Sequence, residues 1–521
     1  MTTPDSRRPP ALLRMAAGVV AAGVAVGIGH LVAALTDPVT SPLIAVGSAL
    51  IDAAPTPAKE FAVRTLGTND KPVLLSTVAL VLLVFAAVLG LVAWQHRRIA
   101  YAGIALLGVA GVVAALTRGG VLDTIPSVLA GVAGVLALRF LLTRRQPRTS
   151  AEEAEPRAAS AIDAAAGRSR RGFLLALGGT AAVAALAGGG GIVVGRVKAA
   201  GAAARRALGL PAPTSPAPPL PEGVQVSGVD RFVTANADFY RVDISLVTPR
   251  VDASTWTLTI DGMVDHPLTL SYDDLLAMPL IERNITLTCV SNEVGGSYVS
   301  TSKWLGVPFS EIIKRVGVQA GVDQVYSYSS DSGYTCSTPF QAVNDGRDAM
   351  IVIGMNGEVL PDAHGYPARM LVPGLFGFVS ATKWLERIEF TTYAKRTAYW
   401  TERKWATDAP ILTQSKIEVP KSLATLPKDK PVIAGVAWAQ HRGIKKVEIR
   451  IDGGDWHDVK LAADGGIDLW RQWSYTYDGP AGLHGAEVRA TDLDGNTQPE
   501  ARTKVFPDGA RGWHQIQFTS E

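Results

Sequence analysis

The stretch Thr286-Leu287-Thr288-Cys289-Val290-Ser291-Asn292 ends an apolar, strand-like run at a cysteine and opens a polar, glycine-rich loop. The chain of 521 residues contains only two cysteines, Cys289 and Cys336. Zinc sites that need several Cys and His ligands at short spacing are therefore excluded, as is a disulfide framework. Three interpretations of Cys289 remain: a catalytic nucleophile, a single thiolate ligand of a cofactor metal, or a buried thiol that packs as a small hydrophobe.

Five further motifs follow Cys289 in one order. They are Lys303-Trp304-Leu305-Gly306-Val307-Pro308-Phe309, Met355-Asn356-Gly357-Glu358-Val359-Leu360-Pro361, His364-Gly365-Tyr366-Pro367-Ala368-Arg369, Val372-Pro373-Gly374 and Thr382-Lys383-Trp384-Leu385-Glu386-Arg387-Ile388. The ordered set resembles the molybdopterin-binding domain of the sulfite oxidase-like molybdoenzymes, over about residues 225 to 400. One motif alone would be weak, but several in one order are specific. The resemblance is to a membrane-anchored bacterial member, of the actinobacterial type.

The resemblance implies an oxidoreductase with a molybdenum-molybdopterin cofactor, in which Cys289 binds the metal and is the catalytic residue. It also implies a set of residues that bind the cofactor. These are Asn236, Phe239, Tyr240, His364, Arg369, Thr382 and Lys383. Cys336 matches no role in the family pattern, so we expect it to be structural.

The residue types in these motifs suit such a cofactor. A pterin dithiolene carries an anionic phosphate and a polar bicyclic ring, so its pocket needs fixed cations and a planar hydrogen-bonding partner. Arg369, Lys383 and His364 provide these groups, while Gly365 and Gly374 permit tight turns and close backbone approach. Taken singly, either cation could be an ordinary surface charge, and the histidine an ordinary hydrogen-bonded loop residue.

The chain departs from the sulfite-oxidising members just after the cysteine. Those enzymes have arginines there that help to hold sulfite, whereas this chain has Glu293-Val294-Gly295-Gly296. A carboxylate near the metal would repel the sulfite dianion. The sequence therefore predicts a neutral substrate, such as a sulfoxide, in preference to sulfite.

The first third of the chain is of another kind. Hydrophobic residues make up 47% of the sequence and the mean hydropathy is +0.18, which is high for a wholly soluble enzyme. Five apolar stretches are about long enough to cross a membrane as helices. They lie near residues 11 to 36, 72 to 94, 99 to 117, 121 to 143 and 172 to 195. The alternative is a set of buried soluble helices, and the shorter run from Pro42 to Ala54 is expected to be interfacial or re-entrant.

Basic residues predict the orientation of these stretches. Three basic clusters lie on one side of the membrane if every stretch crosses it. They are Arg7, Arg8 and Arg14, then His96-Arg97-Arg98, then Arg144, Arg145 and Arg148. By the positive-inside rule that side is the cytoplasm. The fifth stretch then delivers everything after about residue 196 to the outside, so we expect a multi-pass protein of the cell membrane with an extracytoplasmic catalytic domain.

The fifth stretch begins Ser169-Arg170-Arg171-Gly172-Phe173-Leu174, which resembles the twin-arginine export signal of bacteria. Twin-arginine transport carries folded proteins, as a cofactor inserted in the cytoplasm would require. The alternative is that the arginines form only a positive-inside anchor. The sequence leaves open whether this stretch is cleaved after export.

The predicted fold is multi-domain. Residues 1–150 form a four-span membrane region, 151–200 a cytoplasmic linker with the twin-arginine-like fifth span, 201–224 a Pro-rich spacer, 225–404 the α+β molybdopterin-binding domain, and 405–521 an immunoglobulin-like β-sandwich. Strand and helix patterns alternate in the fourth segment. In the fifth, short strands such as Lys446–Ile451 are separated by Gly and Asp turns, which is typical of a sandwich.

These features predict a membrane-anchored enzyme that transfers an oxygen atom on a small sulfur compound or sulfoxide at an external site. The alternatives are a non-catalytic binding or scaffold protein on the same fold, and a membrane electron-transfer protein. The expected partners are a small-molecule substrate, the membrane, and a separate electron donor or acceptor such as a quinone or a redox protein. Resemblance of the last segment to a dimerisation domain predicts a homodimer. A net charge of +3 gives no case for nucleic acid.

Overall fold

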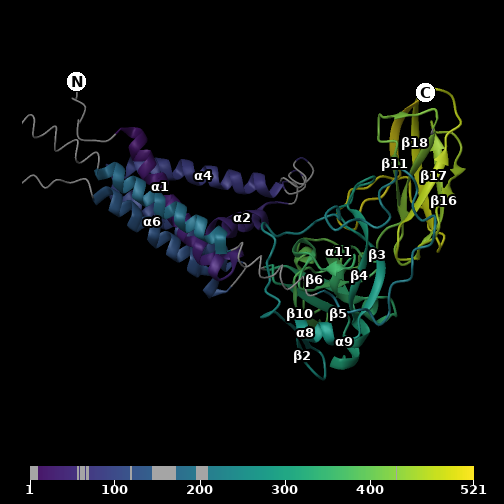
Figure 1. The fold of residues 1–521 in the computed structure, drawn as a ribbon, viewed down its shortest axis with the longest axis horizontal. Helices are drawn as coiled ribbons and strands as arrows, with labels where there is room; N and C mark the ends of the chain where they lie inside the picture. The colour runs from purple at the N-terminus through teal and green to yellow at the C-terminus, as the bar shows by residue number, and fades with distance from the viewer. Residues whose placement is uncertain are drawn as a thin grey trace, which may run out of the picture. The chain divides into compact units, whose positions relative to one another are not determined.

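The computed structural model describes residues 10–55, 58, 61, 65, 70–117, 120–143, 172–194, 209–331, 333–429 and 431–521. The chain forms two compact units, which are described separately (Figure 1). The first consists of residues 1–203 together with 245–248, and the second of residues 204–244 and 249–521.

The first unit is helical, and its described part confirms the five predicted stretches as helices long and apolar enough to cross a membrane. Three of them are α1 (Ala11–Leu35), α4 (Asp70–Val92) and α5 (Arg97–Leu116); the fourth joins the turn Val121–Thr124 to α6 (Ile125–Thr143), and the fifth is Gly172–Val194. The short helix α2 (Pro42–Ala53) corresponds to the run expected to be interfacial. The twin-arginine-like pair and the basic cluster at 144–148 lie outside the described residues.

Small residues allow the helices of this unit to pack closely. A Cβ added to Gly18 of α1 would overlap the backbone of α4, and one added to Gly90 of α4 would overlap the backbone of α1. Large apolar side chains such as Leu80 and Leu106 are instead exposed. Close small-residue contacts with apolar side chains outside are typical of helices packed within lipid.

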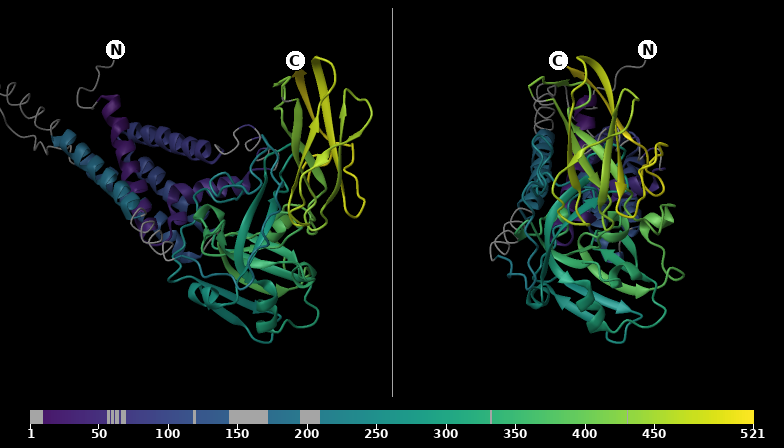
Figure 2. Two further views of the ribbon diagram at one scale, coloured as in Figure 1. Left: turned by 45° about the vertical axis from the view of Figure 1, so that its right-hand side comes forward. Right: turned by 90° about the vertical axis from the view of Figure 1, so that its right-hand side faces the viewer.

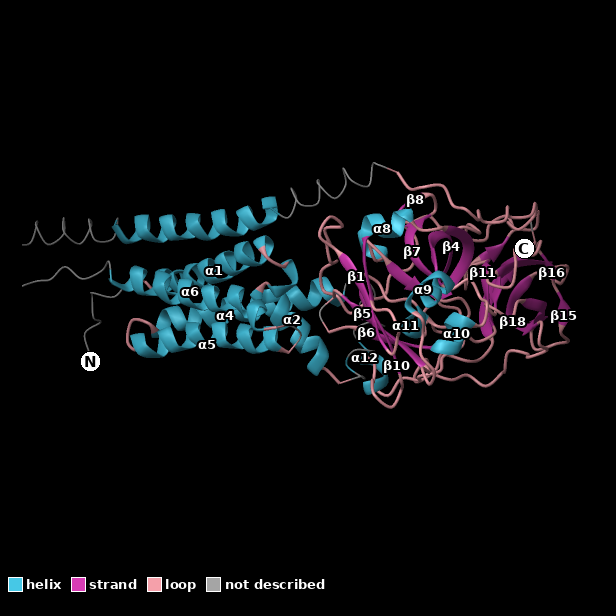
Figure 3. Cartoon of the chain, turned by 90° about the horizontal axis from the view of Figure 1, so that it is seen from below, coloured by secondary structure: helices cyan, strands magenta, loops and turns pink. Residues whose placement is uncertain are grey.

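The second unit begins with a domain of two sheets, which confirms the predicted α+β class (Figure 3). One sheet has the order β2-β1-β10-β5-β6 and the other β3-β4-β7-β8, with β9 paired to β7. Its strands are β1 (Thr257–Gly262), β2 (Leu268–Ser271), β3 (Ile281–Thr288), β4 (Val299–Pro308), β5 (Gln324–Ser329), β6 (Thr335–Pro339), β7 (Met350–Met355), β8 (Glu358–Val359), β9 (Arg369–Leu371) and β10 (Leu385–Thr391). Its helices are α8 (Tyr272–Ala277), α9 (Phe309–Val316), α10 (Phe340–Asn344), α11 (Gly377–Ser380) and α12 (Tyr399–Glu402), with the 3-10 turn η4 (Asp362–His364).

The strand that leads to Cys289 is covered on both faces. Ile285 and Leu287 of β3 are buried in a hydrophobic cluster with Trp304 of β4, while the alternate residues Thr286 and Thr288 are also buried. Side chains along a strand alternate between its two faces. The Leu-Thr alternation before Cys289 therefore reflects an apolar neighbour on one side and hydrogen-bonding neighbours on the other.

The C-terminal part of the second unit is a sandwich of two sheets, as predicted (Figure 2). One sheet has the order β11-β13-β17-β16 and the other β12-β19-β18-β14-β15. The strands are β11 (Gln414–Val419), β12 (Thr425–Leu426), β13 (Val432–Trp438), β14 (Ile444–Ile451), β15 (His457–Asp458), β16 (Lys460–Leu461), β17 (Arg471–Thr476), β18 (Gly482–Asp492) and β19 (His514–Ser520). Trp473, Val488 and Phe518 are fully buried in its core.

The Pro-rich segment, predicted to be an extended spacer, pairs with a strand at residues 214 and 215. The Thr214 amide donates to the Leu280 carbonyl at 2.8 Å, and the Glu282 amide donates to the Ser215 carbonyl at 2.8 Å. Ser215 thereby forms a parallel bridge with Ile281, at the start of β3. The extended conformation that proline favours leaves backbone groups free to pair with a sheet edge. Residues near 214 therefore belong to the molybdopterin-binding domain.

Candidate functional site

Cys289 lies directly after β3, at the start of a closed loop. Its amide donates to the Tyr298 carbonyl at 3.0 Å, and its carbonyl accepts the Asn292 amide at 3.0 Å. The Asn292 side chain, which is buried, accepts the Tyr298 amide at 2.8 Å. The two ends of the loop are thus tied together, and the thiol sits at its base in a partly buried position.

The thiol has two neighbours that favour its ionised form. Its sulfur lies 2.9 Å from the Ser291 hydroxyl oxygen. Burial raises the pKa of the Cys289 thiol, while the hydrogen bond from Ser291 and the positive charge of Lys383 act in the opposite direction. Without a bound cation the thiol is therefore neutral at physiological pH, and a metal would supply the charge needed to hold the thiolate.

Arg369, on β9, is a buried guanidinium, 5% exposed. Its Nη1 donates to the His364 carbonyl at 3.1 Å and its Nη2 to the Ala381 carbonyl at 3.4 Å, while its buried Nε has no partner. The guanidinium carbon lies 5.2 Å from the centre of the Trp304 ring. Burial lowers the pKa of Arg369 to about 10. No carboxylate of the described residues forms an ion pair with Arg369, so its charge is uncompensated within this part of the chain.

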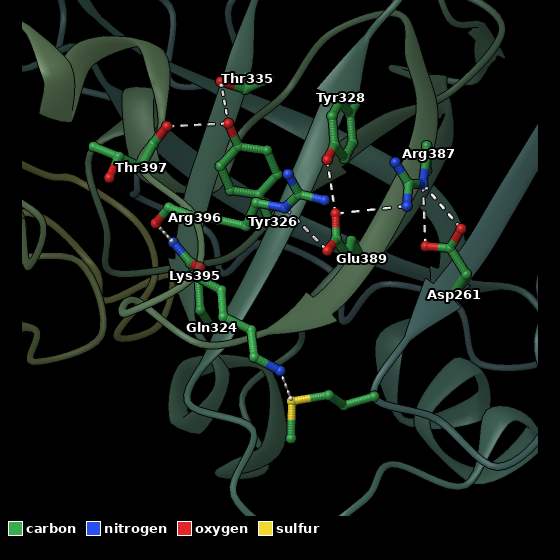
Figure 4. Close-up of polar contacts among 11 residues, drawn as sticks. Asp261, Gln324, Tyr326, Tyr328, Thr335, Arg387, Glu389, Lys395, Arg396 and Thr397 are labelled. Atoms are coloured by element: carbon green, nitrogen blue, oxygen red, sulfur yellow. Dashed lines mark hydrogen bonds and ion pairs between the residues drawn. The ribbon is translucent and has the colours of Figure 1, made fainter.

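In a second charged cluster of the same domain, each arginine forms an ion pair with a carboxylate (Figure 4). Glu389 of β10 accepts a hydrogen bond from Tyr328 at 2.7 Å and forms an ion pair with Arg396 at 3.0 Å. Arg387 in turn binds Asp261 at 3.0 Å. Buried charges are normally paired in this way. Arg369, in contrast, has no such carboxylate partner among the described residues.

Lys383, between α11 and β10, is a paired cation. Its Nζ lies 2.7 Å from Asp243, whose side chain is 4% exposed and also binds Arg241 at 2.9 Å. Burial lowers the pKa of Lys383 to about 8, and Asp243 opposes this effect. A Cβ added to Gly365, which has φ +111°, would come within 3.2 Å of both Lys383 and Arg369. The positive φ and the close contacts with the backbone and Cβ atoms of these two residues therefore favour glycine at position 365.

His364, at the end of η4, is a neutral hydrogen-bonding group rather than a fixed cation. Its Nε2 lies 2.8 Å from the Asn236 carbonyl, so a neutral ring donates from this nitrogen. Burial, aided by the positive charges of Arg369 and Lys383, lowers the pKa of His364 to about 4. The side chain of Asn236 is engaged elsewhere, since its oxygen accepts from Asn356 Nδ2 at 2.9 Å and its Nδ2 donates to the Met355 carbonyl at 3.3 Å.

The predicted aromatic pair packs against Trp304, the ring over which Arg369 lies. Phe239 is buried, with its ring 5.3 Å from that of Tyr240 and 5.4 Å from that of Trp304. Burial raises the pKa of Tyr240, the charge of Cys289 raises it further, and the charge of Arg369 lowers it. Tyr240 is thus within electrostatic reach of both groups. Phe239 stacks against its ring.

Thr382 is fully buried and lies beside the second cysteine. Its hydroxyl is 2.6 Å from that of Ser327, and its hydrogen bond to Cys336 lowers the pKa of that thiol. Burial nevertheless outweighs this effect and raises the pKa of Cys336 to about 11, and its thiol donates to the Phe378 carbonyl at 3.0 Å. These contacts agree with the structural role expected for Cys336.

Sequence reasoning missed two residues of the site. The first is Tyr334, whose pKa is raised well above its ordinary value by burial and further by the charges of both cysteines. The second is Asp243, which forms the ion pair with Lys383. Nothing in the local sequence marked either one. Glu293, expected near the metal, is exposed to solvent, where water and salt screen its charge. Screening of this kind would weaken the predicted repulsion of sulfite.

Comparison with known proteins agrees with this geometry. Residues 245–400 match the model of the oxidoreductase molybdopterin-binding domain family. These residues form a sulfite oxidase-like molybdopterin oxidoreductase domain. The family is described by its binding of molybdopterin, the organic part of the molybdenum cofactor.

The relatives are similar over part of their length. The chain is 29% identical to NADH nitrate reductase of Solanum lycopersicum over 318 residues, covering 48% of the chain and 34% of the relative. It is 27% identical to mitochondrial sulfite oxidase of Homo sapiens over 340 residues, covering 55% and 62%. Among solved structures, the sulfane dehydrogenase SoxCD from Paracoccus pantotrophus matches with 22% identity and a TM-score of 0.48, covering 56% of this chain and 82% of that one. The chain thus spans less than two thirds of the length of the nitrate reductase and of the sulfite oxidase.

The described residues fit this cofactor. They contain no group of three or more His, Cys, Asp and Glu side chains that could hold a metal by themselves. A metal at Cys289 would therefore need its other ligands from a cofactor, and sulfur ligands suit a thiolate site. The uncompensated Arg369 and the glycine that admits it beside Lys383 match an anionic group.

Proposed function

We propose that the chain is a membrane-anchored oxidoreductase that transfers an oxygen atom to or from a small sulfur compound or sulfoxide, at a site outside the cytoplasm. The observation that carries this proposal is the buried guanidinium of Arg369, whose Nε has no hydrogen-bond partner and which forms no ion pair among the described residues. When bound, molybdenum supplies two-electron redox chemistry and oxygen-atom transfer.

In this proposal Cys289 is the single protein ligand of the metal. Ser291 and Lys383 favour its thiolate, and the hydrogen bonds of its loop hold the sulfur at a fixed place. Arg369 and Lys383 hold the anionic part of molybdopterin. Arg369 carries most of this role, because the charge of Lys383 is already shared with Asp243.

The other predicted cofactor-binding residues divide into two groups. Tyr240 and His364 face the site and offer polar groups to the pterin. Asn236, Phe239 and Thr382 act behind them, since the Asn236 carbonyl orients His364, Phe239 supports Tyr240, and the Thr382 hydroxyl is bound to Ser327. Replacement of the second group should then loosen the cofactor without removing a direct contact.

The substrate is proposed as a class. Arg241 keeps 37% of its side chain exposed beside Asp243, and Glu293 is exposed. A small neutral sulfoxide could bind without an interaction with either charged side chain. Binding of an anion such as sulfite would be favoured by the positive charge of Arg241. Electrons would be exchanged with a quinone or a redox protein, and the five apolar helices support a place at the membrane for that exchange.

The experiment is metal analysis and activity screening of the purified full-length protein. Molybdenum should be present, and turnover of sulfite or of sulfoxides should be detected with an artificial electron carrier. Cys289→Ser should abolish turnover, because a hydroxyl is a harder and far less acidic ligand than a thiolate. Cys336→Ser is the matched control and should keep activity. Activity of Cys289→Ser equal to that of the parent would refute the assignment.

A further inference from the structure

The C-terminal sandwich binds directly to the strand that carries the cysteine. Gln440, which follows β13, is fully buried, and its Nε2 donates to the Thr288 hydroxyl oxygen at 2.8 Å. Thr288 is the last residue of β3 and immediately precedes Cys289. The contact lies within one compact unit, although its two residues are 152 positions apart.

Two further contacts join the same segment to the sandwich. The Thr286 amide donates to the Asp468 carbonyl at 2.9 Å, and the Trp470 amide donates to the Thr286 hydroxyl at 2.9 Å. Residues 468–470 thus bind one threonine of β3 through both its backbone and its side chain, while Gln440 binds the next threonine of the same face.

The far end of the cysteine loop also meets the sandwich. A Cβ added to Gly295 would overlap the ring of His514, the first residue of β19. This ring is itself fixed, because its Nδ1 accepts the Ile417 amide at 2.9 Å. The sandwich therefore contacts the segment 286–295 before and after Cys289.

Gln440 has a buried side-chain oxygen whose lack of a hydrogen-bond partner is unfavourable. A buried polar atom without a partner costs roughly 1 to 3 kcal/mol. An apolar residue would avoid that cost if the position only filled space, so the amide is expected to serve another purpose through its donor.

We propose that Gln440 is a positioning residue for the Cys289 thiolate, so that the C-terminal sandwich completes the metal site. This inference rests on the proposed role of Cys289 as the metal ligand. The ladder between β3 and β4 ends at the pair of Thr288 and Val299. Gln440 holds the side chain at that last ladder position, and so fixes the backbone direction from which Cys289 leaves the strand.

Gln472 of β17 provides a matched control. It is also fully buried and also joins the sandwich to the first domain, because its oxygen accepts the Val226 amide at 2.6 Å and its Nε2 donates to the Asp230 carbonyl at 2.8 Å. No hydrogen bond of its side chain reaches β3. Gln472→Leu therefore measures the general cost of losing a buried glutamine at this boundary.

The experiment compares Gln440→Leu with Gln472→Leu in the full-length protein carrying Cys336→Ser, so that Cys289 is the only thiol. Protein from a host that cannot make molybdopterin is labelled with a maleimide, and loaded protein is examined for its thiolate-to-metal absorption. Gln440→Leu should label Cys289 several-fold faster, shift the absorption, and lower kcat by about 10- to 100-fold with little change in KM. Gln472→Leu should lower Tm but leave labelling and absorption as in the parent.

A double-mutant cycle sharpens the result. Thr288→Val should reproduce the effect of Gln440→Leu, the double variant should add little to either, and Thr288→Ser, which keeps the hydroxyl, should behave like the parent. Equal labelling rates and unshifted absorption in Gln440→Leu would overturn the proposal, as would equal effects of the two glutamine variants. If Cys289→Ser kept its metal and activity, the proposed function would fail, whereas the labelling rates would still report on the position of the thiol.

Discussion

Replacement of Arg369 by Met separates the requirements of the fold from those of the cofactor. Burial lowers the pKa of this guanidinium from 12.5 to about 10. At about 1.4 kcal/mol for each pH unit, the interior disfavours the charged form by about 3 kcal/mol. Methionine removes that penalty and fills similar space.

The same change also removes favourable contacts. Hydrogen bonds to the carbonyls of His364 and Ala381 are lost, at about 1 kcal/mol each, together with the interaction over the Trp304 ring, at about 1 kcal/mol. These losses nearly cancel the relief of about 3 kcal/mol. We therefore expect the cofactor-free Arg369→Met protein to be within about 1 kcal/mol of the parent in stability.

A paired arginine should respond differently. Arg442 lies 2.9 Å from the fully buried Asp492, so Arg442→Met leaves a buried carboxylate without its cation and should cost about 3 kcal/mol. Both variants are compared by thermal unfolding of the full-length protein in detergent, followed by tryptophan fluorescence, after expression without molybdopterin. Expression with molybdopterin should then give Arg369→Met with strongly reduced molybdenum content. A cofactor-free Arg369→Met protein as destabilised as Arg442→Met, or one with normal molybdenum content, would refute this reasoning.

Three other predictions concern acid stability, export and substrate charge. Burial lowers the pKa of His514 to about 4, so the folded state keeps this ring neutral while the unfolded chain binds a proton below about pH 6.5. Stability should therefore fall as pH falls from about 6.5 to 4. His514→Asn keeps an acceptor for the Ile417 amide and should flatten the dependence of Tm on pH in that range. An unchanged slope of Tm against pH would contradict a ring that stays neutral in the folded state. Replacing both Arg170 and Arg171 by Lys keeps the charge, so a receptor-read signal should fail and a fusion reporter at the C-terminus should stay inside, whereas normal external placement would favour a simple anchor. Glu293→Arg should change kcat/KM for sulfite by no more than about a few-fold, because the side chain is exposed, and this change should be smaller at high salt. A change of about 100-fold would instead indicate that the Glu293 carboxylate lies near the substrate.

Local patterns in the sequence predicted what depends on local physics. Apolar length identified the five long helices in the described part of the first unit, and the alternation before Cys289 identified a strand that ends directly before the thiol. Gly365 was expected to permit a tight turn, and its φ of +111° agrees with this.

Contacts between distant residues were not predictable in the same way. Asp243 and Lys383 are 140 positions apart, and a carboxylate of this kind has no local signature. The orientation of the Asn236 side chain toward Asn356 depends on how two loops meet, which one sequence does not define. The Pro-rich segment was predicted only as an extended spacer, because composition indicates its extended conformation but not the strand edge with which it pairs.

The central claim is that the Cys289 thiolate binds molybdenum, and X-ray absorption at the molybdenum edge tests it most directly. The protein is purified as the parent, as Cys289→Ser and as Cys336→Ser, and sulfur atoms in the metal's coordination shell are counted. We predict one sulfur fewer in Cys289→Ser than in the parent, and an unchanged count in Cys336→Ser. The same sulfur count in Cys289→Ser and the parent would contradict the claim.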